Sequence, residues 1–263
     1  LDAKRLQGTN AERLALTTLG SAGWTNTGGS NIEFQSSNSR LWVDLDQDSS
    51  YTQVLTRTLS TTSNTAWVLR FKCYATSVTS NGSLIVVLST NANPSDDEQR
   101  LGGFWWKALN SSSIRAVTDD NNDSGGICAG NNTDGNGGTP TDETDYYVTI
   151  VRDGDNLEVT VRTGSHTGSV QFGGDPFTTP LTSSVTTGLN TLKIMNHKCS
   201  SGGQWKGYLY DLEFYNGITS VSSETPTYET DFTDTYPSLP NGTIFNETDT
   251  YKYFMFDGTD TWN

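Results

Sequence analysis

The chain has 263 residues, a formal net charge of −14 and a mean hydropathy of −0.52. Its 16 basic residues are scattered singly and form no patch that could displace counterions from phosphates, so nucleic acid is not an expected partner. No run of about 18 apolar residues occurs, so no membrane insertion is expected. Serine and threonine make up about a quarter of the chain, which favours short β-strands joined by polar turns.

The first twenty residues carry the one good helix signal. Thr9-Asn10-Ala11-Glu12 matches a capping box, a short apolar stretch follows, and Gly20 is a stop signal. Residues 1–20 are therefore predicted to form a short N-terminal helical arm.

Strand patterns replace the helix pattern from Trp24 onwards. The run Ser83–Leu88 is almost entirely apolar, which predicts a central strand, and Asp153-Gly154-Asp155-Asn156 predicts a hairpin turn. Ten or more short strands without intervening helices indicate an all-β, antiparallel two-sheet jelly-roll sandwich over residues 21–220. The clearest strand patterns cover Ile32–Phe34, Leu41–Leu45, Tyr51–Leu59, Ala66–Ala75, Phe104–Leu109, Ile114–Val117, Tyr146–Arg152, Leu157–Arg162, Leu192–Met195 and Gly207–Tyr215.

Two segments depart from this pattern. Asp119 to Thr141 is poor in apolar residues and too long for a hairpin loop, which predicts a functional loop or a mobile insertion. Residues 221–263 are predicted to be a linker and a C-terminal β-hairpin built from Thr243–Phe245 and Tyr251–Phe256. A lone hairpin is only marginally stable, so its aromatic residues are expected to pack on the sandwich or on a neighbouring copy.

Several segments carry resemblances to known proteins. Ala66–Phe71, the pair Tyr146–Arg152 and Leu157–Val161, and Gly207–Gly217 resemble the concanavalin A-like, laminin-G-type jelly roll. This resemblance implies a lectin-like sandwich. Lys4–Arg13 and Leu239–Thr250 resemble segments of structural proteins, such as fibre and decoration proteins, from tailed viruses of bacteria or archaea.

Catalytic patterns are weak. Glycosidases of this fold carry paired carboxylates on one strand, and the nearest match, at Glu229 and Asp231, lacks the final glutamate. The two histidines, His166 and His197, are expected to be loop residues, and no nucleophile elbow is present. No catalytic residue is predicted, and the chain is expected not to be an enzyme.

A single structural Ca²⁺ is the one cofactor that the sequence suggests. A mobile polar loop is the favoured interpretation of this segment, and the alternative is a calcium loop whose ligands supply clustered oxygen atoms: Asp119, Asp120, Asn121 and Asp123. Asp44, Asp46 and Asp48 have the spacing of the first ligands of a calcium-binding loop, but strand alternation explains the same spacing by placing them on one polar face.

The three cysteines leave at least one thiol unpaired. Cys73 continues the apolar face of its strand and is expected to be a small buried residue. Cys128 and Cys199 lie in polar loops, where either a disulfide or two free thiols would fit.

Four tryptophans are candidate carbohydrate or partner contacts. Trp105 and Trp106 are adjacent on one strand and point to opposite faces, so one indole must leave the inter-sheet core. That indole could stack on a glycan, lie under a loop or the terminal hairpin, or contact a subunit. Trp24 and Trp205 flank the ends of the sandwich, where edge packing is the alternative to ligand binding.

Together, these patterns and resemblances favour a non-catalytic structural or attachment protein of a virus particle, such as a fibre, decoration or tail component. Its expected location is extracellular, on the virion surface. The expected partners are its own copies in a homo-oligomer, neighbouring virion proteins and host-surface glycans. The alternative is a glycan-binding lectin domain of a secreted or cell-surface protein, and a glycoside hydrolase is the least favoured reading.

Overall fold

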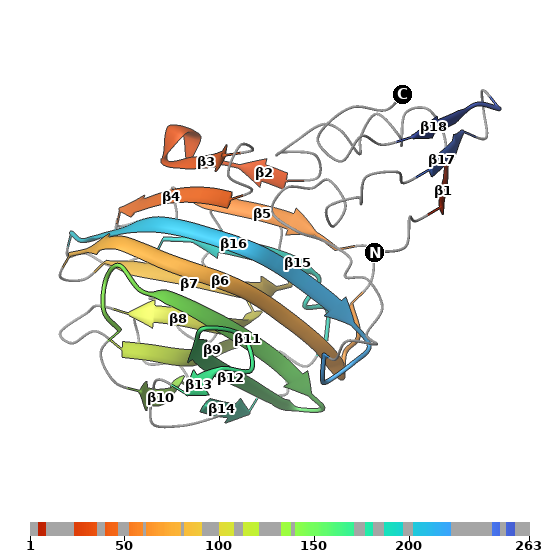
Figure 1. Cartoon of the computed structure of the whole chain (residues 1–263). Helices are drawn as coiled ribbons and strands as arrows, with labels where there is room; N and C mark the ends of the chain where they lie inside the picture. Colours follow the sequence, from red (N-terminus) through yellow and green to blue (C-terminus); the bar gives the residue numbers. More distant parts are fainter. Residues whose placement is uncertain are drawn as a thin grey trace.

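A computed structural model shows two large β-sheets packed face to face and a third, small sheet built from the two ends of the chain (Figure 1). The structure describes residues 5–8, 24–35, 40–46, 53–59, 62–79, 82–90, 100–107, 113–120, 133–137, 140–170, 177–180, 187–196, 202–221, 244–247 and 251–255. Within these residues the one helical element is a short 3₁₀ turn, η1 (Gly29–Asn31), and no helix is long and apolar enough to cross a membrane.

The first large sheet has seven strands, and every pair of neighbouring strands in it is antiparallel. Their order across the sheet is β10 (Thr133–Gly137), β9 (Ser113–Asp120), β8 (Arg100–Lys107), β7 (Ser83–Ser89), β15 (Thr191–Met195), β5 (Val54–Thr58) and β2 (Trp24–Asn26). The apolar strand β7 lies at the centre and is buried along its whole length, which confirms its predicted position.

The second large sheet has eight strands and is also antiparallel. Their order is β13 (Ser169–Val170), β12 (Asn156–Thr163), β11 (Asp145–Asp153), β6 (Ala66–Val78), β16 (Gln204–Asn216), β4 (Arg40–Asp46) and β3 (Ile32–Gln35), with β14 (Phe177–Pro180) also paired to β12. The predicted hairpin joins β11 to β12. Gly154 has a φ of 62° in its turn, as mirror-image hairpin turns require.

The two sheets form an all-β, jelly-roll-like sandwich, as predicted, and large aromatic rings fill the space between them. Trp106 of the seven-stranded sheet packs edge-on against Trp205 and Tyr146 of the other sheet, with ring centroids 5.7 and 5.6 Å apart. Phe71 and Phe104 make a similar contact across the core at 5.6 Å. Cys73 is fully buried in this core, as expected, and burial raises the pKa of its thiol.

A one-residue bulge in β16 sets which side chains reach the outer surface. Tyr210 lies opposite Lys72, and the next paired residue, Glu213, lies opposite Arg70, so β16 carries one residue more than β6 at this point. Asp211 absorbs the extra residue with a φ of 49°. The extra residue shifts the alternation by one position. After it, Phe214 points into the core and Glu213 points outward.

The ends of the chain meet in the third sheet. Strand β1 (Arg5–Gly8) pairs in parallel with β17 (Ile244–Glu247), and β17 pairs antiparallel with β18 (Tyr253–Met255), which forms the predicted C-terminal hairpin. Tyr251 and Tyr253 are 85% and 72% exposed. Residues 5–8 of the predicted N-terminal helical arm form strand β1 instead, because β17 offers them hydrogen-bonding partners, and the residues of the helix signal, 9–20, lie outside the described residues. The division into segments 1–20, 21–220 and 221–263 stays a prediction.

Candidate functional site

The four tryptophans predicted as ligand contacts are buried. Trp105 is 2% exposed, Trp106 and Trp205 are 0% exposed, and Trp24 is 7% exposed. Trp106, Trp24 and Trp205 belong to the core between the sheets, whereas Trp105 points to the opposite side of the seven-stranded sheet, as alternation requires. None of the four presents an open ring face, so the structure places the accessible aromatic surface elsewhere and corrects this expectation.

The two sheets differ in how far their outer faces are covered. On the seven-stranded sheet the outward side chains form a second buried cluster, each at most 2% exposed: Val54, Ile85, Val87, Trp105, Val117 and Met195. On the eight-stranded sheet the outward side chains of β4, β6 and β16 are mostly half-buried and reach solvent. Within the described part of the chain, the outer face of the eight-stranded sheet is therefore the broad surface open to a ligand.

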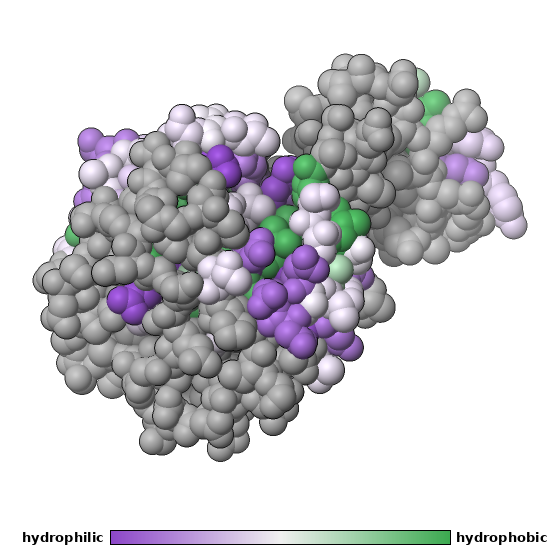
Figure 2. All heavy atoms as spheres, turned by 90° about the horizontal axis from the view of Figure 1, so that it is seen from below, coloured by the Kyte–Doolittle hydropathy of each residue, from purple (hydrophilic) through white to green (hydrophobic). Residues whose placement is uncertain are grey.

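Strand alternation builds this outer face. In β6 the even-numbered residues from Arg70 to Tyr74 point outward, because the odd-numbered ones from Trp67 to Ala75 fill the core. Figure 1 shows β6 and β16 side by side at the middle of this sheet, and their register brings outward residues of both strands together. From below, the described hydrophilic and hydrophobic side chains are interspersed on the surface (Figure 2).

Four aromatic residues on this face make up what we call the aromatic cluster: Trp42, Tyr74, Tyr208 and Tyr210. Tyr208 lies at its centre, opposite Trp42 of β4 and Tyr74 of β6. Its ring centroid is 4.9 Å from that of Trp42, 6.4 Å from that of Tyr74 and 6.1 Å from that of Tyr210. All four rings are half-buried, so they offer apolar surface to a ligand without being sealed in the core.

Two cations lie against these rings. The guanidinium carbon of Arg40 is 3.6 Å from the centroid of the Tyr208 ring. The ammonium nitrogen of Lys72 is 4.3 Å from the centroid of the Tyr210 ring and 5.9 Å from that of Tyr147. Cation–π contacts of this kind hold long side chains in place while leaving charged atoms near solvent. The face therefore combines apolar ring surface with positioned hydrogen-bond donors.

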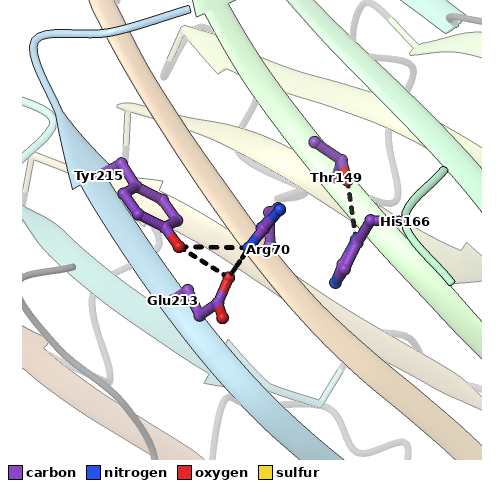
Figure 3. A network of polar contacts seen from close by, with 5 residues as sticks. All are labelled: Arg70, Thr149, His166, Glu213 and Tyr215. Atoms are coloured by element: carbon purple, nitrogen blue, oxygen red, sulfur yellow. Dashed lines mark hydrogen bonds and ion pairs between the residues drawn. The ribbon is translucent and has the colours of Figure 1, made fainter. Parts of the chain in front are cut away.

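A polar network lies beside the aromatic cluster (Figure 3). Arg70 donates from Nε to Glu213 Oε2 at 2.7 Å, and its Nη2 also contacts this oxygen and donates to the Tyr215 hydroxyl at 3.2 Å. Tyr215 donates to Glu213 Oε2 at 3.0 Å. On the other side of Arg70, Thr149 Oγ1 and His166 Nδ1 share a hydrogen bond of 3.0 Å.

Burial and neighbouring charge set the protonation of this network. Burial, together with the nearby Arg70 cation, lowers the pKa of His166 to about 4, so the imidazole is neutral at neutral pH. Burial and the Glu213 carboxylate raise the pKa of Tyr215 to about 12, so its phenol keeps its proton. At neutral pH the network thus holds a neutral imidazole, a neutral phenol and a guanidinium–carboxylate pair.

The predicted calcium site falls only partly within the described residues and stays a prediction. Asp119 and Asp120 are the last residues of β9, so they belong to a strand and not to the predicted loop, which also contains strand β10. Asn121 and Asp123 lie outside the described residues. Within the residues described, no group of three or more histidine, cysteine, aspartate or glutamate side chains could hold a metal ion.

The other aspartate cluster has local partners. Asp44 forms an ion pair with Lys206 at 2.8 Å, and Asp46 accepts hydrogen bonds from Gln53 and Gln204 at 3.2 Å. Both aspartates are on the outward side of β4, as the alternation predicted. Asp48 lies outside the described residues, as do Cys128 and Cys199, so their disulfide stays a prediction.

Sequence reasoning missed the residues that build this face. His166 does lie in a turn, as expected, but it is tied to Thr149 and packs edge-on against Tyr147 with ring centroids 5.3 Å apart. A usable signal was present in β6 and β16, because the polar half of each alternating strand is itself rich in tyrosine, arginine and lysine.

No family model matches the chain, and no curated protein matches it. Solved structures with a similar fold exist. A family 7 alginate lyase, A1-II′, in complex with substrate has 12% identity and a TM-score of 0.49, covering 73% of this chain and 84% of its own. The alginate lyase AlyC3 has 10% identity and a TM-score of 0.46, covering 77% and 91%. A legume lectin-like domain from Entamoeba histolytica has 9% identity and a TM-score of 0.43, covering 79% and 93%.

These structures correct the expectation that the chain is not an enzyme. The named lyases share the sandwich with the lectin-like domain, so this fold accommodates enzymes as well as binding proteins. A role in a virus particle, by contrast, finds no counterpart among the three structures named here. The likeness concerns the lectin-like fold, and the function of this chain has to be argued from its own residues.

Proposed function

We propose that this chain binds a carbohydrate on the outer face of its eight-stranded sheet. The observation that carries the proposal is the aromatic cluster around Tyr208, flanked by Arg40 and Lys72, on the broad face that the described structure leaves accessible. Ligand sites combine apolar, largely aromatic surface with a few positioned polar groups. A sugar ring matches this combination, because its C–H faces pack on aromatic rings and its hydroxyls bond to charged side chains.

The rigidity of the face supports the same function. The aromatic cluster and its cations stand on paired strands, not on loops, and each ring is braced by a neighbour across the sheet. Groups that are already positioned lose little conformational entropy when a ligand binds. A host-attachment role on a virus particle would be a finer form of this proposal. It rests on the resemblance of residues 4–13 and 239–250 alone.

The test is glycan binding by the wild-type chain and two single variants. Tyr208→Ala removes the central ring of the cluster and should weaken binding by roughly tenfold or more, as loss of a central aromatic anchor does. Tyr253→Ala removes a tyrosine that is 72% exposed on the third sheet and should leave binding unchanged. A glycan array identifies the ligand, and titration calorimetry measures the affinities. Equal affinities for both variants, or no glycan retained at all, would contradict the proposal.

A second candidate is proton-transfer chemistry on the bound glycan. It is favoured by the neutral imidazole of His166 and the protonated phenol of Tyr215, which lie on either side of the Arg70 cation (Figure 3). A neutral imidazole can accept a proton from a sugar carbon while a phenol supplies one to the leaving glycosidic oxygen, so that the C–O bond breaks as a C=C bond forms. The chain should then shorten a polysaccharide that it binds, and His166→Asn should abolish the shortening while binding persists. An unchanged polymer length after long incubation would exclude this candidate.

A further inference from the structure

A single row of side chains crosses the outer face at right angles to the strands. Strand pairing places its five members directly opposite one another on consecutive strands from β4 to β12, and we call it the cation–aromatic row: Arg40, Tyr210, Lys72, Tyr147 and Arg162. Cations and tyrosines alternate along the whole row. The pattern arises from five separate strands, so no local sequence repeat could produce it.

The row contains no carboxylate. Arg40 donates from Nε to the neutral Gln35 at 2.8 Å and stacks on Tyr208. Lys72 forms an ion pair with Asp145 at 3.4 Å, and the side chain of this aspartate is 47% exposed. An exposed ion pair of this kind is weak and its carboxylate can turn into solvent, which frees the ammonium group for another anion. Arg162 donates from Nη1 to the carbonyl of Gly168 at 2.9 Å, which fixes the end of the row.

The spacing of the row suits a linear polymer. Neighbouring strands lie about 4.8 Å apart, so the cations, which stand on alternate strands, recur about every 10 Å. An extended linear glycan advances by roughly one strand spacing per sugar. A chain lying along the row would therefore place successive sugars over successive strands, with a cation at every second sugar and a tyrosine ring between.

We infer that the cation–aromatic row recognises a linear acidic polysaccharide that crosses the strands from β4 towards β12. This inference deepens the proposed function and rests on it. The acidic groups are carboxylates or sulfate esters, since both accept hydrogen bonds from guanidinium and ammonium donors. The net charge of −14 does not oppose such a ligand strongly, because charges more than about 8 Å apart are screened at physiological salt and the row itself is basic.

The experiment compares three probes on the full chain. These are polygalacturonate, the same polymer with its carboxyl groups reduced to alcohols, and a linear sulfated galactan. The row predicts that polygalacturonate binds at least roughly tenfold tighter than its reduced form, because one charged hydrogen bond is worth about that factor. Binding should also weaken as salt is added, and it should stop rising with oligomer length at about five sugars, one for each strand of the row.

Variants that remove one positive charge test whether Lys72 and Arg40 bind the acidic groups of the polymer. Lys72→Gln and Arg40→Gln should each weaken polygalacturonate binding roughly tenfold and weaken binding of the reduced polymer by a smaller factor, because a neutral hydroxyl loses a weaker hydrogen bond than a carboxylate does. Lys206→Gln is the matched control, because it removes the same charge from the same sheet, outside the row and paired with Asp44. Thermal unfolding of each variant establishes that it is folded.

The outcomes separate the inference from the proposed function. Tight binding of either acidic polymer that depends on Lys72 and Arg40 supports the row, and the preferred polymer identifies the acidic group. Equal binding of the native and reduced polymers overturns the inference but keeps carbohydrate binding. Equal loss in Lys206→Gln also overturns it, because the effect would then reflect overall charge. Failure to bind any glycan overturns both the inference and the proposed function.

Discussion

At the scale of single residues, His166 is the group whose chemistry depends most on its surroundings. It shares a hydrogen bond with Thr149 and lies edge-on against Tyr147, and burial together with the Arg70 cation lowers its pKa from 6.5 to about 4. In the unfolded chain the same imidazole titrates near its ordinary value. The folded and unfolded states therefore bind different numbers of protons between these two pKa values.

The sign of the pH effect follows from proton linkage. Between pH 6.5 and 4 the unfolded state binds more protons, so the free energy of unfolding falls as the pH falls through this range. The imidazole contributes its full stabilisation above pH 6.5 and loses up to a few kcal/mol of it by pH 4. Urea denaturation at several pH values, compared with the His166→Gln variant, measures the effect. Parallel curves for the two proteins would contradict the assignment, since carboxylates titrate equally in both.

At single residues, the side of the sheet on which a side chain lies could be predicted, because strand alternation determines it. Contacts with residues distant in the sequence could not be predicted. The opposite orientations of Trp105 and Trp106 follow from alternation and were predicted. That the outward indole would be buried as well could not be predicted, because alternation tells on which side of the sheet a residue lies and not what covers that side. Tyr208 and Arg40 were missed for a related reason. Their importance depends on contact with each other, and they come from strands far apart in the chain.

At the scale of elements, the bulge at Asp211 determines which side chains of β16 face the core and which face outward. An ordinary strand would lose the outward placement of Glu213 and the inward placement of Phe214 after this point, because a one-residue slip exchanges the two faces. The backbone at Asp211 has a φ of 49°, a region that aspartate and glycine tolerate and β-branched residues do not. The bulge therefore depends on the residue type at this position.

Two substitutions at Asp211 test this dependence. Asp211→Val should lower the free energy of unfolding by about 1–2 kcal/mol, because a β-branched residue is strained in the left-handed region. Asp211→Gly should change it by less than about 0.5 kcal/mol, since glycine adopts this backbone freely and the site is exposed. Chemical denaturation of the two variants gives both values. Equal stabilities would mean that the bulge is not held by this residue.

Most strands were predictable, including the edge strand β3, but several other edge strands were not. Strands such as β7, β11 and β16 carry strong alternation or strong apolar character of their own. The strands β2, β10 and β13 lie at sheet edges, and β10 consists of the polar segment Thr133–Gly137. Such edge strands form because a neighbour offers hydrogen bonds, and composition alone does not reveal that partner.

At the scale of the whole molecule, the sandwich has two unlike sides. The seven-stranded sheet is buried on both faces in the described structure, whereas the eight-stranded sheet keeps an accessible outer face with aromatic rings and cations. The two ends of the chain meet in a separate small sheet, which no local pattern could predict because β1 and β17 lie at opposite ends of the sequence. The proposed function depends on the accessible face being the one that holds the ligand.

Hydroxyl-radical footprinting with and without a saturating glycan tests this directly, because tyrosine and tryptophan side chains are oxidised according to their exposure. The account predicts that the glycan protects Trp42, Tyr208 and Tyr210 from oxidation. Tyr251 and Tyr253, which are 85% and 72% exposed on and beside the third sheet, should be oxidised equally in both samples and serve as the internal control. Protection of Tyr251 and Tyr253, with Trp42 and Tyr208 unchanged, would place the ligand on the third sheet and contradict the account.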